Sequence, residues 1–411
     1  MPDFGLIRLN FIGYSLSSHA SLGLSQVPPV YNECLELFGL GGDMKRSILA
    51  IGLCVLTIFA SPIQSFAEGE WEFTPDSEKA IDRGLAWLAR NQGPAGNWES
   101  QDLGLVALGA MAFLSAGHAP GRSQYGDNVK RALDYIIANA KPSGLLNISS
   151  EGRDMYNHGL ATFCLTQAYG NVPDRRLGKV LDKGIQLICN VQCDDGGWDY
   201  VARQQSRGHD LSLAVMQAKA LRGATDIGLD IPPQVIEKAI ASVRGYYRPL
   251  AAPDGKQYGA DPLGARPGAF TYSGGKVTTA MAAAGAVCLQ EFGEYADFRI
   301  PRSLDYVAND IQKMPVRTGH IPFDAYTMFY VGQGLYQVGG ERWKTNYPVI
   351  RDAIVKSQYN STRTDVDGSW EGGRVGGTPG KLFGTSVAVF VLSIPNRYLP
   401  ILQEGEFPDS K

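Results

Sequence analysis

Six stretches of the chain place apolar residues three to four positions apart, with polar residues between them. They cover residues 77–92, 126–141, 174–192, 234–248, 302–313 and 347–358. This spacing gathers the apolar side chains on one face of an α-helix and leaves the other face polar. Each stretch therefore predicts an amphipathic helix that packs on a core with one side.

A second set of six stretches alternates with the first and is apolar on nearly all sides. They cover residues 103–116, 158–169, 211–222, 277–292, 325–338 and 385–394. Glycines follow five of them, where a left-handed helix end favours this residue: Gly117, Gly170, Gly223, Gly293 and Gly339. These stretches predict inner helices that the amphipathic set covers.

Each amphipathic stretch is followed by a glycine with a large apolar residue two positions later. The six instances are Gly96-Asn-Trp98, Gly144-Leu-Leu146, Gly196-Gly-Trp198, Gly268-Ala-Phe270, Gly319-His-Ile321 and Gly368-Ser-Trp370. An interval of roughly 50 residues is typical of helix-pair repeats, which bury their apolar faces only by stacking on neighbours. We expect an all-α protein in which six helical hairpins close into an (α/α)6 toroid. An open solenoid of the same hairpins is the alternative.

The N-terminal part carries the pattern of an export signal. Residues 48–60 are apolar, Lys45 and Arg46 precede them, and the small residues Ser65 and Ala67 follow. A basic start, a short apolar run and a small-x-small end are typical of a cleavable signal peptide. We expect residues 1–43 to precede the true start, residues 44–67 to be the signal, and residues 68–411 to form a single toroid domain. The mature chain would then be periplasmic or extracellular and keep no stable membrane anchor; an uncleaved anchor is the alternative.

Charge and cysteine content limit the classes of partner and of covalent cross-link that we expect. The net charge of −3 and the scattered basic residues form no basic stripe, which argues against nucleic acid. Four cysteines follow the signal, at positions 164, 189, 193 and 288, too few for a disulfide scaffold. Cys189 and Cys193 lie four residues apart, so either a bridge or two buried thiols is open.

Three of the repeats also carry a glutamine before the glycine. The pairs are Gln92 with Trp98, Gln192 with Trp198 and, more widely spaced, Gln358 with Trp370. This pattern resembles the QW motif of squalene and hopene cyclases. The chain is thus similar to the α/α toroids of the terpenoid cyclase and protein prenyltransferase superfamily. The resemblance implies that each glutamine ends an outer helix and that each tryptophan packs over it as a structural clamp.

The catalytic strings of the best-known toroids are missing. The chain has no D-x-D-D acid motif, no D-x-C zinc motif and no G-C-G-E-Q thioester motif. We therefore expect neither a metal nor a cofactor. Asp194, Asp195 and Asp199 flank Trp198, and they favour a solvated turn over a calcium site.

Parallel inner helices would bring their N-termini to one rim, where free amides and partial positive charge favour polar ligands. Acids and imidazoles converging there suit acid–base chemistry if burial shifts their pKa values. The candidate catalytic residues are Asp102, His158, Asp210 and Asp324, and the candidate ligand-binding residues are Tyr156, His209, Tyr272 and Tyr326. Asp154 stands at the same ends. The alternative is that the aspartates only cap helices and the histidines are structural.

Two long Gly- and Pro-rich loops, residues 249–276 and 360–381, are expected on the same rim as a lid or partner surface. The predicted function is a non-catalytic ligand-binding or scaffold role outside the cytoplasm, with a small-molecule or protein ligand at the rim. The alternative is a divergent enzyme acting on a polyprenyl, terpenoid or carbohydrate substrate in the toroid cavity.

Overall fold

The computed structural model describes residues 71–172, 174–250, 267–373 and 380–403, all within one compact unit, Ala67–Lys411. The predicted extension and signal peptide lie outside the described residues, as do parts of both long loops, and they stay predictions. Within the described ranges, none of the helices has the length and apolar character needed to cross a membrane.

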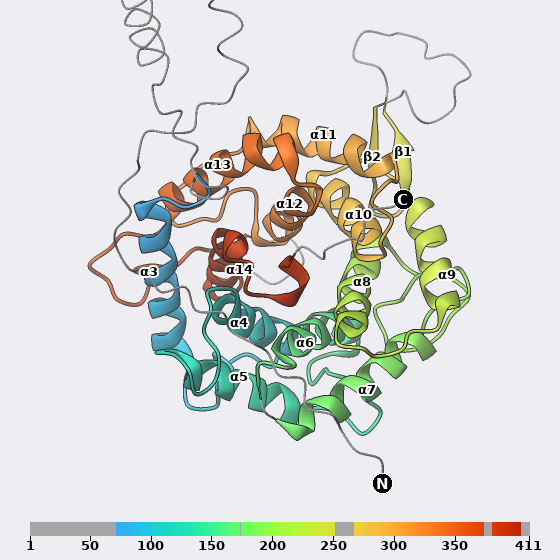
Figure 1. The fold of residues 1–411 in the computed structure, drawn as a ribbon, viewed down its shortest axis with the longest axis horizontal. Coiled ribbons are helices and arrows are strands. Elements are labelled where there is room, and N and C mark those ends of the chain that lie inside the picture. The colour runs from blue at the N-terminus through green and yellow to red at the C-terminus, as the bar shows by residue number, and fades with distance from the viewer. Residues whose placement is uncertain (1–70, 173, 251–266, 374–379, 404–411) are drawn as a thin grey trace, which may run out of the picture. The chain divides into compact units, whose positions relative to one another are not determined.

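An inner ring of helices surrounds the axis of this unit (Figure 1). Its members are α4 (Leu103–Ser115), α6 (Asp154–Ala168), α8 (Leu211–Asp226), α10 (Thr279–Glu291), α12 (Ala325–Val338) and α14 (Lys381–Ser393). Each packs on the next, and α14 packs on α4, so the ring is closed. The open solenoid is thereby excluded.

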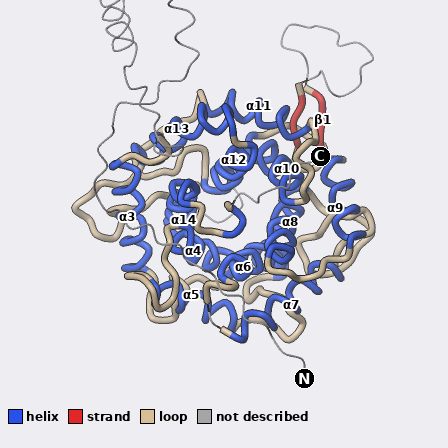
Figure 2. Tube along the Cα trace, viewed as in Figure 1, coloured by secondary structure: helices blue, strands red, loops and turns tan. Residues whose placement is uncertain are grey.

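A second ring of helices covers the first (Figure 2). It consists of α3 (Pro75–Asn91), α5 (Gly126–Ala138), α7 (Arg175–Asn190), α9 (Pro233–Arg244), α11 (Arg299–Ile311) and α13 (Gly340–Ser357). The predicted all-helical toroid is confirmed. The twelve α-helices are those of the described residues, and the six-hairpin count remains a prediction for the whole chain.

The two rings differ in burial as their sequences predict. Helix α7 buries a single stripe that includes Leu177, Leu181 and Ile188, whereas almost every residue of α10 is buried. Gly223 departs from the prediction because it lies inside α8 instead of ending it. A Cβ there would come within 2.1 Å of Thr166 Oγ1, so this glycine allows α8 to approach α6 closely.

Two short strands follow α9, where the sequence predicted the end of a helix and a glycine turn. Strand β1 (Tyr247–Pro249) pairs antiparallel with β2 (Gly268–Phe270). The predicted helix over 234–248 therefore ends at Arg244, and Gly268 lies in a strand. Pro249 cannot donate to a helix ladder, and the β2 ring of Phe270 packs directly on Gly285 of α10, where no side chain would fit.

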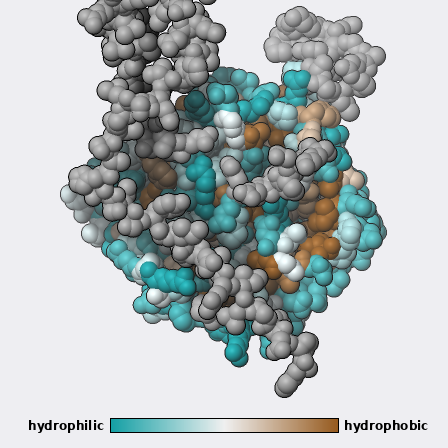
Figure 3. All heavy atoms as spheres, in the orientation of Figure 1, coloured by the Kyte–Doolittle hydropathy of each residue, from teal (hydrophilic) through white to brown (hydrophobic). Residues whose placement is uncertain are grey.

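The chain that follows α14 turns into the centre of the ring, where Figure 1 shows it in red. Two short 3₁₀ turns, η4 (Ile394–Asn396) and η5 (Pro400–Leu402), form this segment. Ile401 N donates to Gln167 Oε1 (2.9 Å), and Tyr336 Oη donates to Leu402 O (2.6 Å). The chain itself thus enters one end of the barrel. In Figure 3, hydrophilic residues dominate the perimeter of the face in view and apolar residues lie nearer its middle.

The glutamine–tryptophan pairs join neighbouring outer helices. Gln192 Nε2 donates to Gly196 O (3.0 Å) and to Val235 O in α9 (2.9 Å), and Trp198 Nε1 donates to Ile188 O in α7 (2.9 Å). Equivalent bonds run from Gln92 to Gly96 and Asn128, from Trp98 to Leu88, from Gln358 to Gly368 and Ala80, and from Trp370 to Ile354. Gln358 and Trp370 hold the end of α13 to α3, which helps to close the ring. Their assignment to the cyclase motif stays a prediction.

Candidate functional site

The N-terminal rim is the end of the toroid where the inner helices begin, and Asp210 is its most heavily bonded acid. Asp210 is the N-cap of α8, and its side chain has no exposed surface. Its Oδ1 accepts from Ser212 N (2.8 Å) and from Ser212 Oγ. Its Oδ2 accepts from Tyr200 Oη (2.8 Å) and lies 2.9 Å from His209 Nδ1. The carboxylate is thus saturated by protein groups.

Two further tyrosines extend this cluster, which we call the Asp210 network. Tyr272 Oη is hydrogen-bonded to Tyr200 Oη, and Tyr156 Oη to Ser212 Oγ. Burial raises the pKa of Tyr156 to about 12 and also raises the pKa of Tyr272. Hydrogen bonds therefore run from the exposed Tyr272 and the half-exposed His209 side chains to a buried carboxylate.

A cavity of about 40 Å³ lies beside this network at the same rim. We call it the rim cavity. Its lining is mostly apolar, and its polar members are Asp102, Arg153, Tyr156 and Tyr326. A water needs about 10–15 Å³ of such space, so the cavity holds a few water-sized groups and no complete substrate.

Two polar atoms of the rim cavity have no hydrogen-bond partner in the described part of the chain. They are Asp102 Oδ1 and Tyr326 Oη, and both are buried. The other carboxylate oxygen of Asp102 forms an ion pair with Arg153. Burial raises the pKa of Asp102, although the charge of Arg153 opposes this shift. Burial also raises the pKa of Tyr326 well above its usual value. The sequence-predicted residues Asp102, Tyr156 and Tyr326 therefore meet in one place.

Two of the candidate catalytic residues form hydrogen bonds with their own surroundings. Asp324 accepts from Thr327 N (2.9 Å) and Thr327 Oγ1 (2.7 Å) at the start of α12, which makes it a helix cap. His158 is buried in the wall, where Nδ1 accepts from Leu146 N (3.1 Å) and Nε2 donates to Gly184 O (3.0 Å). Burial lowers the pKa of His158 to about 4. Both side chains are held by these hydrogen bonds, and their predicted catalytic role stays a prediction.

Asp102 caps its helix only weakly: burial raises its pKa, and the amides of Gly104 and Leu105 only partly oppose this rise. Although it precedes α4 as the N-cap residue, its side chain makes no capping hydrogen bond. Asp154 is also engaged elsewhere, since it accepts from Asn147 Nδ2 (2.7 Å) and Ala202 N (3.2 Å).

The acidic turn around Trp198 is held by its own backbone. Asp195 Oδ1 accepts from Gly197 N (3.0 Å) and Gly208 N (2.9 Å). Among residues with described positions, no group of three or more His, Cys, Asp or Glu side chains is arranged to hold a metal ion. The geometry favours the turn over a calcium site.

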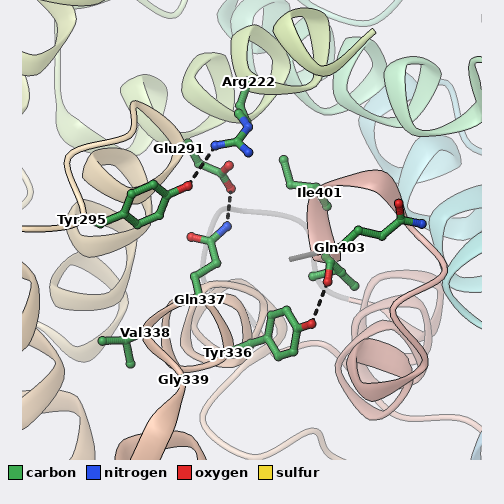
Figure 4. A pocket seen from close by; sticks show the side chains of 10 residues that line it. Arg222, Glu291, Tyr295, Tyr336, Gln337, Val338, Gly339, Ile401 and Gln403 are labelled. Carbon is green, nitrogen blue, oxygen red and sulfur yellow. Dashed lines mark hydrogen bonds between the residues drawn. The ribbon is translucent and has the colours of Figure 1, made fainter. Parts of the chain in front are cut away.

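The opposite end of the toroid, the C-terminal rim, holds a larger hollow of about 430 Å³ (Figure 4). We call it the C-terminal pocket. The ends of α8, α10 and α12 and the η5 segment form its walls. Its lining residues are Arg222, Glu291, Tyr295, Tyr336, Gln337, Val338, Gly339, Ile401, Leu402 and Gln403.

A buried ion pair forms part of this wall. Lys219 Nζ lies 2.7 Å from Glu291 Oε1, and each side chain is only 1% exposed. The ammonium also lies 4.5 Å from the centre of the Phe163 ring. Gln337 Nε2 donates to the same carboxylate oxygen (3.2 Å). Lys219 and Glu291 were not among the residues predicted from the sequence, although a lysine and a glutamate inside otherwise apolar inner helices were a usable signal.

Comparisons with known proteins support the fold. No protein-family model matches the chain, and neither does any curated protein. An unsaturated glucuronyl hydrolase from Bacillus sp. GL1 matches with a TM-score of 0.51 and 14% identity over 77% of this chain and 96% of that one. An α-amylase from Clostridium perfringens matches with a TM-score of 0.50 and 11% identity over 77% and 97%. The chain has an α/α-toroid fold.

A type II terpene cyclase from Scytonema also matches, with a TM-score of 0.49 and 13% identity over 78% of this chain and 97% of that one. The toroid fold that the sequence resemblance implies is confirmed by the hydrolase and amylase structures. At such low identity, none of these likenesses transfers an activity to the chain.

Proposed function

We propose that this chain is an exported, non-catalytic ligand-binding toroid that holds a polar group of its ligand in the rim cavity. The observation that carries the proposal is that Asp102 Oδ1 and Tyr326 Oη are buried there, and neither has a hydrogen-bond partner within normal distance among the described residues. The Ser212 hydroxyl acts on Tyr326 only weakly. A buried polar atom without a partner costs about 1–3 kcal/mol. Ligand hydroxyl groups can donate to the carboxylate and accept from the phenol.

The size and lining of the rim cavity define how such a ligand sits. Only a small group enters about 40 Å³, so the body of the ligand would lie across the mouth. Leu105, Leu160 and Phe383 line the cavity beside the polar atoms. This combination suits an amphiphilic molecule with a terminal hydroxyl group.

A binding role is favoured because the other three candidate catalytic side chains already form hydrogen bonds within the protein. Asp210 is saturated by its network, and Asp324 and His158 are bonded to their own backbone surroundings. General acid–base catalysis needs groups that can reach a substrate proton. Of the four candidate catalytic residues, Asp102 alone keeps a side-chain oxygen without a hydrogen-bond partner among the described residues.

The test is to purify the full chain, extract bound small molecules and identify them by mass spectrometry. We expect one amphiphilic species with wild type and roughly a tenfold loss with Tyr326→Phe and with Asp102→Leu, because each change removes a hydrogen bond to a buried partner. Tyr330→Phe is the matched control, since Tyr330 Oη donates to Met216 Sδ and does not line the cavity. Equal amounts in all four proteins would reject this site.

A divergent enzyme is the second candidate, and the raised pKa of Asp102 favours it. A carboxyl group that holds its proton to higher pH in a cavity is suited to donate that proton to a substrate. The extracted molecule, added back to wild-type protein, would then be converted over time, and Asp102→Asn would stop the conversion. A molecule recovered unchanged supports the binding role.

A further inference from the structure

We infer that the C-terminal pocket is a second binding site, distinct from the rim cavity, for a neutral polyhydroxylated ligand of mono- or disaccharide size. Its volume of about 430 Å³ falls in the range of small-molecule sites, which is roughly 300–1,000 Å³. The hollow opens on the C-terminal rim and shares no lining residue with the rim cavity.

The charges around the C-terminal pocket cancel in pairs. Glu291 is neutralised by Lys219, and Arg222 Nε donates to Asp226 Oδ1 (2.8 Å). An ionic ligand would have to compete with a partner already in place, and it would leave one member of a pair without its counter-ion. A ligand without net charge disturbs neither pair.

The hydrogen-bonding groups of the pocket favour a ligand that both donates and accepts hydrogen bonds. Gln337 Oε1 is a buried acceptor with no partner in the described ranges, although Gln337 Nε2 is bonded to Glu291. Arg222 uses Nε for Asp226 and Nη1 for Tyr295 Oη (2.9 Å), and the guanidinium has five N–H groups in all. Hydroxyl groups are the simplest partners for this set, because each can donate to Gln337 and accept from Arg222.

The remaining lining suits the C–H faces of a sugar ring. In Figure 4, Tyr295 and Tyr336 stand on the α10–α12 side of the pocket and Ile401 lies across from them on η5. Tyr336 is fixed by its bond to Leu402 O (2.6 Å), which also holds the η5 wall in position. Aromatic and aliphatic walls around a few polar groups provide both affinity and orientation.

The experiment measures binding of glucose, maltose and myo-inositol to the full chain by saturation-transfer NMR and calorimetry, with L-glutamine as a zwitterionic probe. We expect at least one neutral probe to bind at millimolar concentrations. Gln337→Leu should weaken it roughly five- to tenfold, the effect of one net hydrogen bond. Gln333→Leu is the matched control, because Gln333 is one turn earlier on α12, also has an unpartnered Oε1, and does not line the pocket.

Two further variants test whether the probe binds in the C-terminal pocket. Gln403→Trp, at an exposed position on the pocket edge, should block the neutral probe without burying new surface in the core. Asp102→Asn, at the opposite rim, should leave its affinity unchanged. Binding of glutamine alone, binding of no probe, or loss of sugar binding in Asp102→Asn with retention in Gln337→Leu would each overturn the inference.

Discussion

Buried carboxylates at the two rims of the toroid are stabilised by different partners. Asp210 and Asp324 stand at the N-terminal rim, and backbone N–H and hydroxyl groups surround them. Glu291 is the last residue of α10 at the C-terminal rim, and an ammonium group only 2.7 Å away balances it. Helix N-termini carry partial positive charge and free amides, whereas C-termini carry partial negative charge. The helix direction therefore explains why an acid needs a cation at one rim and not at the other.

Asp102 lies at the N-terminal rim, but its partners differ from those of Asp210 and Asp324. It precedes an inner helix as Asp210 and Asp324 do, but its main partner is Arg153, and the amides of Gly104 and Leu105 act on it more weakly. One oxygen is left in the rim cavity without a partner. This difference marks Asp102 as the acid positioned for something other than capping.

The largest predicted effect comes from the C-terminal rim. Lys219→Met leaves the Glu291 carboxylate buried near a helix C-terminus without its cation. Removing one partner of a buried pair costs about 3–5 kcal/mol of unfolding free energy. Urea denaturation of the two proteins measures the difference. The double variant Lys219→Met/Glu291→Leu should recover most of the loss, because apolar residues of similar volume replace such pairs at little cost. A single variant as stable as wild type would contradict the dipole argument.

The second effect is a pH dependence of the unfolding free energy, which arises from His158 in the wall of the toroid. The folded-state pKa of His158 is about 4, below its usual value of 6.5, because burial disfavours the charged ring. Between these values the unfolded chain binds a proton that the folded chain does not, so stability falls as pH decreases from 6.5 toward 4. At about 1.4 kcal/mol per pKa unit the total is about 3 kcal/mol.

The control for this titration is His158→Gln, whose amide can replace both backbone hydrogen bonds but does not titrate. Unfolding free energies measured at several pH values should show a flatter profile for the variant over that window. Parallel profiles for the two proteins would mean that His158 is not the group responsible.

The sequence predicts the toroid well because its signals are local. Alternating amphipathic and apolar stretches, helix caps and tight glycine turns all act within one repeat, and they place Asp102, Tyr156 and Tyr326 at one rim. Contacts between residues far apart in the sequence could not be predicted in this way. Nothing near residues 394–402 indicates that this segment enters the barrel, since its partners Gln167 and Tyr336 are far away in sequence. The role of Tyr200 was also missed, although it lies only ten residues before Asp210, because its bond to Tyr272 spans 72 residues.

The third prediction separates two caps within the N-terminal rim. Asp210→Ala removes a carboxylate with several donors, including Tyr200 Oη and two groups of Ser212, and should cost about 2–3 kcal/mol. Asp324→Ala removes a cap whose side-chain donors are the amide and hydroxyl of Thr327 alone, and should cost about 1 kcal/mol. Thermal and urea unfolding of the pair measure the ranking. Equal losses would show that the tyrosines add nothing to the cap.

The smallest expected effect has the opposite sign. Tyr326→Phe removes a buried hydroxyl group that lacks a partner in the described structure, while keeping the ring that packs on Tyr330 with centroids 5.1 Å apart. Without a bound ligand, the variant should be more stable than wild type by about 1 kcal/mol, because no desolvated hydroxyl remains in the folded state. Tyr330→Phe should show no gain, since it removes a bonded hydroxyl. If Tyr326→Phe instead destabilises the ligand-free protein, the hydroxyl already has a partner there, such as a bound water. The rim cavity would then lose the unsatisfied group on which its proposed binding role rests.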